Sequence, residues 1–121
     1  MANTFKVVNF AAEPASAGTP YVMYTVASGA TTVVLGLVLS NINTSAVTAE
    51  VELVSTTSSR GGVNNVANGT SFLVKDVNIP TGSSLEILSG GKVVLEAGDK
   101  IQIDCSVADK LSGTLSIMEI T

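Results

Sequence analysis

A hydrophobic period of two residues runs through this chain, and it is the feature that most constrains the fold. Apolar and polar residues alternate in segment 46–55: Ala49, Val51 and Leu53 against Thr48, Glu50 and Glu52. Segment 100–107 repeats the pattern with four residues on its apolar side: Ile101, Ile103, Cys105 and Val107. This is the period of a β-strand with one buried face, and no window shows the period of an amphipathic helix. The sequence therefore predicts an all-β protein.

Clusters of Gly, Asn, Ser and Pro divide the chain into about eight or nine short strands. The expected strands are 5–10, 21–26, 31–42, 46–55, 70–79, 84–88, 92–95, 100–107 and 111–120. Short strands with frequent turns are typical of an antiparallel β-sandwich or a closed barrel. We expect a single-domain antiparallel β-sandwich, and jelly-roll and Ig-like topologies both fit the pattern.

The length of 121 residues corresponds to one domain. Residues 1–20 are expected to form an N-terminal strand and an arm or linker, because segment 11–20 is small, contains Pro and lacks periodicity. Residues 21–121 are expected to form the sandwich, interrupted by the long polar segment 56–69. The expected core consists of Val22, Val34, Leu37, Leu39, Val51, Leu53, Ile101, Ile103, Cys105, Leu115 and Ile117.

The charge content disfavours several classes of partner. Charged residues make up 13% of the chain and the net charge is −4, with only six Lys and Arg residues. Such a chain is a poor electrostatic match to a phosphate backbone, so no nucleic-acid binding is expected. No apolar run is long enough to cross a membrane, and the first residues lack the pattern of a signal peptide. We therefore expect synthesis in a host cytoplasm and no membrane partner.

Catalytic and metal-binding chemistry is also disfavoured. The chain has no His and one Cys, so the usual Ser-His-Asp, Cys-His and zinc sites cannot form. The carboxylates of Glu96, Asp99 and Asp104 lack the spacing of a calcium loop and are expected to be turn and surface groups. Cys105 is expected to be a small buried core residue. We expect no enzymatic activity, no cofactor and no metal.

Residues 33–39 have the sequence VVLGLVL, so the residues that would face either side of a strand are apolar. A strand with one wet face should alternate, so both faces of this strand are expected to be covered. The strand is either central and internal, or its outer face is buried by another subunit. Strict alternation places Val34 with Val38 on one face and Leu35 with Leu37 on the other. The interface candidates are Val34, Leu35, Leu37, Val38, Arg60 and Val63, and a homo-oligomer is expected.

Segments 24–54 and 79–120 resemble a group of small virion proteins of tailed bacteriophages, in particular those of marine and cyanobacterial phages. The shared pattern is a strand, a small-residue turn with Gly, and an apolar strand that ends in a polar Asn/Ser turn. An LEAGD turn at residues 95–99 then precedes two final strands, and the ending at residues 118–120 is similar as well. The resemblance implies a β-sandwich structural protein without a catalytic motif.

The function expected from this resemblance is that of a phage virion structural protein, foremost a capsid decoration (cement) protein. It would stabilise the shell through interfaces with the major capsid protein, and its location would be the virion. A neck, tail or fibre-associated component is the alternative location. From another class, a ligand- or carbohydrate-binding β-sandwich is the alternative. Aromatic residues make up 4% of the chain and Trp is absent, which disfavours stacking on sugars.

Overall fold

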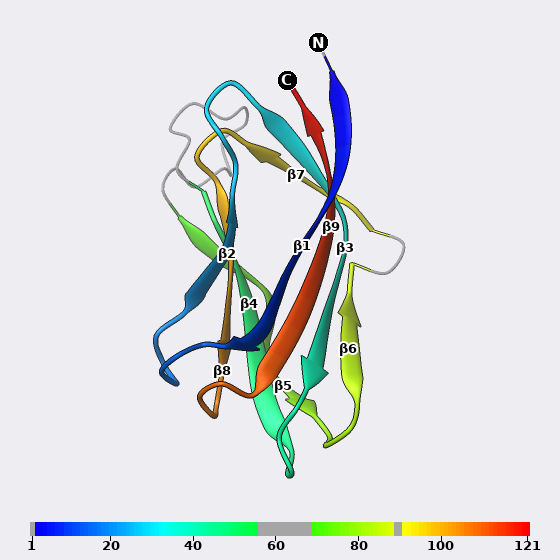
Figure 1. Cartoon of the computed structure of the whole chain (residues 1–121). Helices are drawn as coiled ribbons and strands as arrows, with labels where there is room; N and C mark the ends of the chain where they lie inside the picture. The colour runs from blue at the N-terminus through cyan, green and yellow to red at the C-terminus, as the bar shows by residue number, and fades with distance from the viewer. Residues whose placement is uncertain (1, 56–68, 89–90) are drawn as a thin grey trace.

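The computed structural model describes residues 2–55, 69–88 and 91–121 (Figure 1). Within these residues the chain forms nine strands and no helix, so no helix there could cross a membrane. The strands are β1 (Asn3–Glu13), β2 (Tyr21–Thr25), β3 (Thr31–Asn41), β4 (Val47–Val54), β5 (Thr70–Ile79), β6 (Ser84–Ile87), β7 (Val93–Glu96), β8 (Lys100–Cys105) and β9 (Leu111–Ile120). The prediction of an all-β sandwich is confirmed.

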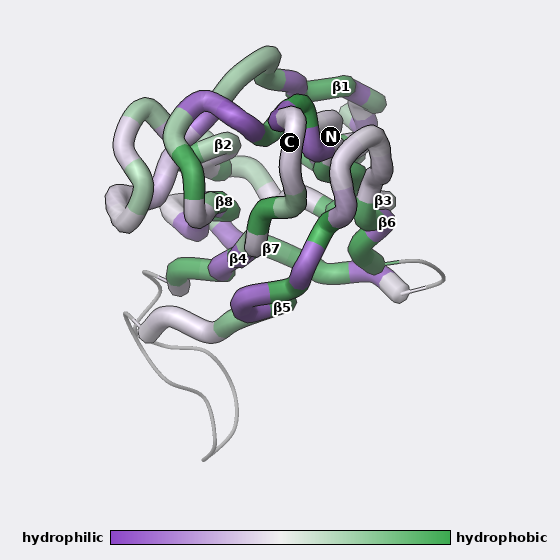
Figure 2. Tube along the Cα trace, turned by 90° about the horizontal axis from the view of Figure 1, so that it is seen from below, coloured by the Kyte–Doolittle hydropathy of each residue, from purple (hydrophilic) through white to green (hydrophobic). Residues whose placement is uncertain are grey.

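The strands form two antiparallel sheets that face each other (Figures 1 and 2). Sheet A has the order β1-β9-β3-β6, with β7 also paired to β3, and sheet B has the order β2-β8-β4-β5. Because β6 pairs with residues 37–40 of β3 and β7 pairs with residues 31–34, the two form one interrupted edge strand. Successive strands β1 to β4 alternate between the sheets, which is the double Greek key of a jelly roll. The strand order therefore selects the jelly roll over the Ig-like topology.

One hydrophobic core fills the space between the sheets, and Figure 2 shows hydrophobic and hydrophilic residues alternating along the strands that enclose it. Most of the expected core residues are fully buried, and Leu53 is half-buried at the margin of the core. The expected burial of Val22 is wrong: its side chain is 41% exposed, and the β2–β8 register shifts between Val22 and Tyr24. The inward position expected for Val107 is also wrong, because β8 ends at Cys105.

A β-bulge in β3 accounts for much of the unbroken apolar run at residues 33–39. The pairing with β9 shifts between Val34 and Gly36, so Leu35 is an extra residue in β3. As a result, Val34 and Leu37 both point into the core and are 1% exposed, whereas Val38 is 38% exposed on the other side. The face assignment expected from strict alternation is therefore wrong.

Strand β1 is longer than the expected 5–10 and pairs with β9 from Asn3 to Glu13. Its inner side is anchored by Phe10, which is buried and contacts Tyr21 of β2 edge to face, with ring centroids 5.3 Å apart. Residues 14–20 then cross to sheet B. The two chain termini lie at the same end of the sandwich (Figure 1), where Ala2 and Thr121 exchange two backbone hydrogen bonds. Strand β1 thus forms one edge of sheet A.

Candidate interaction surface

The strand register brings apolar side chains from four strands into one row on the outer face of sheet A, the face turned away from sheet B. Phe5 of β1 pairs with Met118 of β9, Met118 pairs with Val33 of β3, and Val33 pairs with Val94 of β7. Directly opposed residues of antiparallel strands project to the same side. Ile117, the neighbour of Met118, is in the core. The row therefore faces outward.

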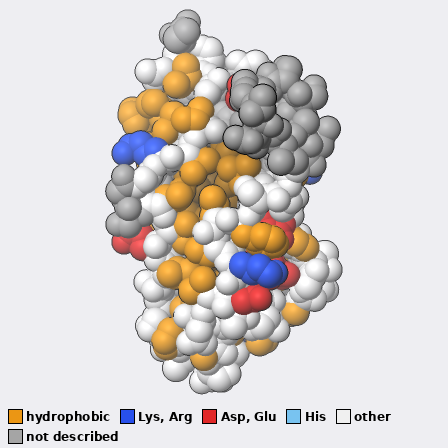
Figure 3. Space-filling model, turned by 180° about the vertical axis from the view of Figure 1, so that it is seen from behind, with side chains coloured by type: hydrophobic (Ala, Val, Ile, Leu, Met, Phe, Trp, Pro, Cys, Tyr) orange, Lys and Arg blue, Asp and Glu red, His pale blue; other side chains and the backbone are white. Residues whose placement is uncertain are grey.

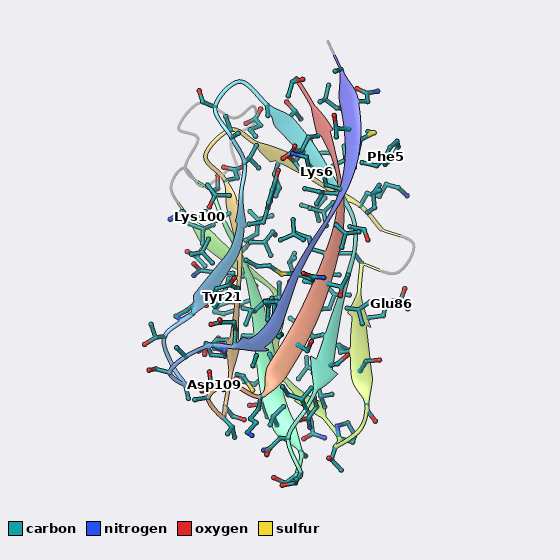
Figure 4. All side chains as sticks on the ribbon, viewed as in Figure 1. Phe5, Lys6, Tyr21, Glu86, Lys100 and Asp109 are labelled. Carbon is teal, nitrogen blue, oxygen red and sulfur yellow. The ribbon has the colours of Figure 1, made fainter. Side chains whose placement is uncertain are left out.

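Adjacent positions widen this row into a patch that we call the apolar band. The band consists of Phe5, Val7, Val33, Leu35, Val94, Met118 and Ile120. None of these side chains belongs to the buried core or packs against it from the margin. Phe5 is 71% exposed, Val7 is 64% exposed and Val94 is 56% exposed. The band lies toward the end of sheet A that carries the chain termini, and Figure 4 shows Phe5 pointing away from the sandwich.

The outer face of sheet B is more polar. Glu50 faces Asp104 and Glu52 faces Gln102, and the exposed hydrophobic residues of this face, Val22 and Phe72, lie opposite Gln102 and Glu52. Lys75 Nζ lies 3.3 Å from Glu50 Oε1. Glu50, Glu52, Gln102 and Asp104 are half-buried along this face, so several charged side chains lie on the sheet opposite the apolar band. The outer face of sheet A is consequently the surface best suited to contact another protein.

A polar network holds the end of β1 beneath the band. Lys6 lies on the opposite side of β1 from Phe5 (Figure 4), with its Nζ 2.6 Å from Glu119 Oε1. The Tyr24 hydroxyl of β2 donates to Glu119 Oε2 at 2.6 Å and lies 2.8 Å from Thr32 Oγ1, whose hydroxyl donates in return. Hydrogen bonds from Lys6 and Tyr24 lower the pKa of Glu119, and burial raises the pKa of Tyr24 to about 12. The network joins sheet A to sheet B.

A hollow of about 170 Å³ lies against sheet B, and the carboxylates of Glu50, Asp76 and Asp104 line it. Burial and the neighbouring Asp76 raise the pKa of Glu50. Cys105 also borders this hollow, but its side chain is buried, as expected, and burial raises the pKa of the thiol. In the described part of the chain, no group of three or more His, Cys, Asp or Glu side chains could hold a metal ion. The hollow presents no activated nucleophile.

A strip of hydrophobic side chains runs along the side of the sandwich that faces away from the viewer in Figure 1 (Figure 3). The edge strands on this side contribute half-buried residues that pack against the core: Leu73 and Val74 of β5, Leu85 of β6 and Val93 of β7. These residues close the seam between the two sheets. Because these residues pack against the core, their position at the surface needs no binding partner to explain it.

The residues singled out from the sequence divide between the core and the surface. Val34 and Leu37 lie in the core, whereas Leu35 belongs to the apolar band and Val38 lies one row away on the same face. Arg60 and Val63 lie outside the described residues. The other residues of the apolar band were not among the predicted contacts. The clearest sequence signal for the band is the N-terminal alternation, in which Phe5 and Val7 flank Lys6.

Of the carboxylates expected at turns and on the surface, Glu96 is exposed, whereas Asp99 and Asp104 are more buried than expected. Asp99 is fully buried, and its Oδ2 accepts the Glu96 backbone N–H at 3.0 Å across the β7–β8 turn. Asp104 is half-buried and its Oδ1 accepts the Gly18 N–H at 3.1 Å. Asp99 therefore stabilises a turn, and Asp104 attaches the 14–20 connection to β8.

No protein family model and no curated protein matches the chain. Among solved structures, it is similar to a chain from Bacillus endospore appendages, described as a novel family of disulfide-linked pili. The sequences are 17% identical, the match covers 99% of this chain and 87% of that chain, and the TM-score is 0.47. A likeness at this level assigns no family and carries no conclusion about function.

Proposed function

We propose that this protein is a structural subunit of a bacteriophage virion, where it decorates the capsid shell and holds neighbouring shell subunits together. The observation that carries the proposal is the apolar band on the outer face of sheet A. The proposed role needs no catalysis, cofactor or metal. It needs a stable domain with a surface that gains free energy when it is covered.

The apolar band meets this requirement in its physical character. Burying a large aliphatic or aromatic side chain contributes about 1.5–3 kcal/mol, and Phe5, Val7 and Val94 are more than half exposed. The strand and row spacings give the band a footprint on the order of 400 Å². A standard interface buries about 800 Å² on each partner. The band alone therefore fits a modest contact, of the kind that acts through many copies on a lattice.

The assignment to a virion is supported by the sequence resemblance of segments 24–54 and 79–120 to small virion proteins of tailed phages. The jelly-roll strand order is compatible with this assignment, because jelly rolls are common in viral capsid domains. They also occur in lectins and cupins, so the fold by itself does not select a virion. The proposal of a virion as the assembly therefore rests on the sequence resemblance, and the proposal of a contact surface rests on the apolar band.

Binding of the purified protein to phage particles that lack it tests the proposal. We expect Val94→Lys to weaken binding strongly, because it places a charge within a contact that excludes water. Val22→Lys is the matched control, since Val22 is also an exposed valine but lies on sheet B. Equal binding by the two variants would contradict the assignment of the surface. Copy number on the particle then separates a capsid position, with hundreds of copies, from a small ring at the neck or tail.

A further inference from the structure

Three of the four sheet edges in the described structure carry features that oppose pairing with another strand. Strand β2 has five residues and a register shift, and β5 has two register shifts with Asp76 at a φ of 51°. The third edge is divided, because β6 ends at Ile87 and β7 begins at Val93. Short length, bulges and interruptions are the usual means by which edge strands avoid self-association.

The fourth edge, β1, has none of these features over residues 3–10. Its register with β9 is unbroken there, and no described strand pairs with its other side. Phe5 and Val7 are the most exposed large hydrophobic side chains of the described residues. Lys6 is the only charged residue of this stretch, and its ammonium group is already paired with Glu119. A long, regular and apolar edge of this kind is a template for strand addition.

We infer that β1 pairs with β1 of a second copy of this chain, antiparallel and about a two-fold axis perpendicular to the sheet. The inference deepens the proposed function, because it names the partner of the β1 edge. Two-fold symmetry makes an edge strand complementary to itself, whereas a different protein would have to supply a free edge of its own. The pairing joins the two copies of sheet A into one continuous sheet.

Continuity of the apolar band also favours a second copy as the partner. A perpendicular two-fold axis keeps Phe5 and Val7 of both copies on the same outer face. The two bands then merge across the new strand pair and run from Val94 of one copy to Val94 of the other. The combined footprint is on the order of 800 Å², which is the area that one partner contributes to a standard interface. The dimer thus offers a larger docking surface than the monomer.

The side chains of β1 favour one register. Because both copies present the same face, a residue of β1 can lie opposite its own copy at the axis. With Val7 at the axis, Lys6 faces Val8, and the whole stretch from Thr4 to Phe10 is paired. With Lys6 at the axis, two ammonium groups would face each other, which is destabilising. The geometry therefore places Val7 opposite Val7.

Disulfide trapping tests this register. Opposed Cα atoms of an antiparallel pair lie about 4.5–5.5 Å apart, within the range that a disulfide spans. We expect Val7→Cys to form a covalent dimer under mild oxidation. Val94→Cys is the control, since it is similarly exposed on the same band but lies on the opposite edge of sheet A. The native Cys105 is buried and does not compete. Failure of Val7→Cys to cross-link, or equal cross-linking of Val94→Cys, would overturn the inference.

Sedimentation of the unmodified protein and of two lysine variants completes the test. We expect the wild type to dimerise, Val7→Lys to be a folded monomer by circular dichroism, and Val94→Lys to remain dimeric. Dissociation by both substitutions would indicate face-to-face stacking of the bands and would contradict edge pairing. If Val7→Lys does not fold, the cross-linking result decides. A wild type that binds particles as a monomer refutes only the edge inference, whereas a dimer that binds no particle refutes only the proposed function.

Discussion

Gly113 of β9 shows how one residue determines the position of a whole strand. A Cβ atom at this position would lie 2.5 Å from Cε1 and Cζ of Phe10 and 3.1 Å from Cδ2 of Leu39. The Phe10 ring therefore packs directly on the β9 backbone, in space that any side chain would occupy. Since Phe10 is the buried anchor of β1, the missing side chain of Gly113 is what allows β1 to close the core.

We expect Gly113→Ala to lower the free energy of unfolding by about 1–3 kcal/mol, because the added methyl group overpacks the core and displaces the Phe10 ring. Urea denaturation measures this loss. Gly36→Ala is the matched control, since a Cβ there meets no atom within 4 Å. Its effect should stay within about 0.5 kcal/mol. Equal effects of the two substitutions would show that Phe10 does not constrain position 113.

The Lys6–Glu119–Tyr24 network predicts a specific pH dependence of stability. Lys6 and Tyr24 hold the pKa of Glu119 below its ordinary value of 4.5. A carboxyl whose pKa is lower in the folded state stabilises the protein above its unfolded pKa, and this contribution disappears as the pH falls through the folded pKa. Glu119→Gln should therefore reduce stability at neutral pH. It should also flatten the loss of stability below about pH 4.5.

Urea midpoints across an acidic pH series measure this difference. Tyr24→Phe removes one of the two hydrogen-bond donors to Glu119 and should give an intermediate profile. Parallel profiles for the wild type and Glu119→Gln would mean that the ion pair does not persist in solution.

At the scale of elements, the β3 bulge predicts that Ala substitutions at neighbouring positions of β3 differ in their cost to stability. Leu37→Ala should cost about 2–5 kcal/mol, the range for an aliphatic truncation in a core. Val38→Ala should cost no more than about 0.5 kcal/mol, as is usual for a surface position. Val34→Ala should be costly as well, although strict alternation pairs Val34 with Val38. Denaturant titration of the three variants checks this pattern, and a costly Val38→Ala would exclude the bulge.

Local pattern was enough to predict where most strands lie but not which way each residue faces. The ranges 70–79 and 111–120 coincide with β5 and β9, because turn residues mark their ends clearly. The C-terminal part of β1 was missed, because the small residues at positions 11 and 12 carry no periodic signal and their pairing partner β9 is remote in sequence. Leu35 was assigned to a wrong face for a related reason, since a bulge arises from pairing with a neighbour.

At the scale of the whole molecule, the sandwich has two unlike outer faces, and this asymmetry could not be predicted from composition. A charged fraction of 13% indicates a weakly solvated surface but does not locate it. The apolar band exists because Phe5, Met118, Val33 and Val94 come into one register across four strands. Val34 and Leu37, two of the residues expected as contacts, lie in the core, and the exposed side chains of the apolar band come mainly from the strands beside β3.

The unlike faces predict how the proposed assembly responds to salt. An interface formed by the apolar band is strengthened by sulfate, which is excluded from protein surfaces and favours burial of apolar area. Sodium chloride screens charges, and it should leave such an interface unweakened. We therefore expect particle binding by the wild type to tighten with ammonium sulfate and to persist in high sodium chloride. If sodium chloride releases the protein, charged groups such as those on sheet B hold the assembly, and the apolar band is not its contact surface.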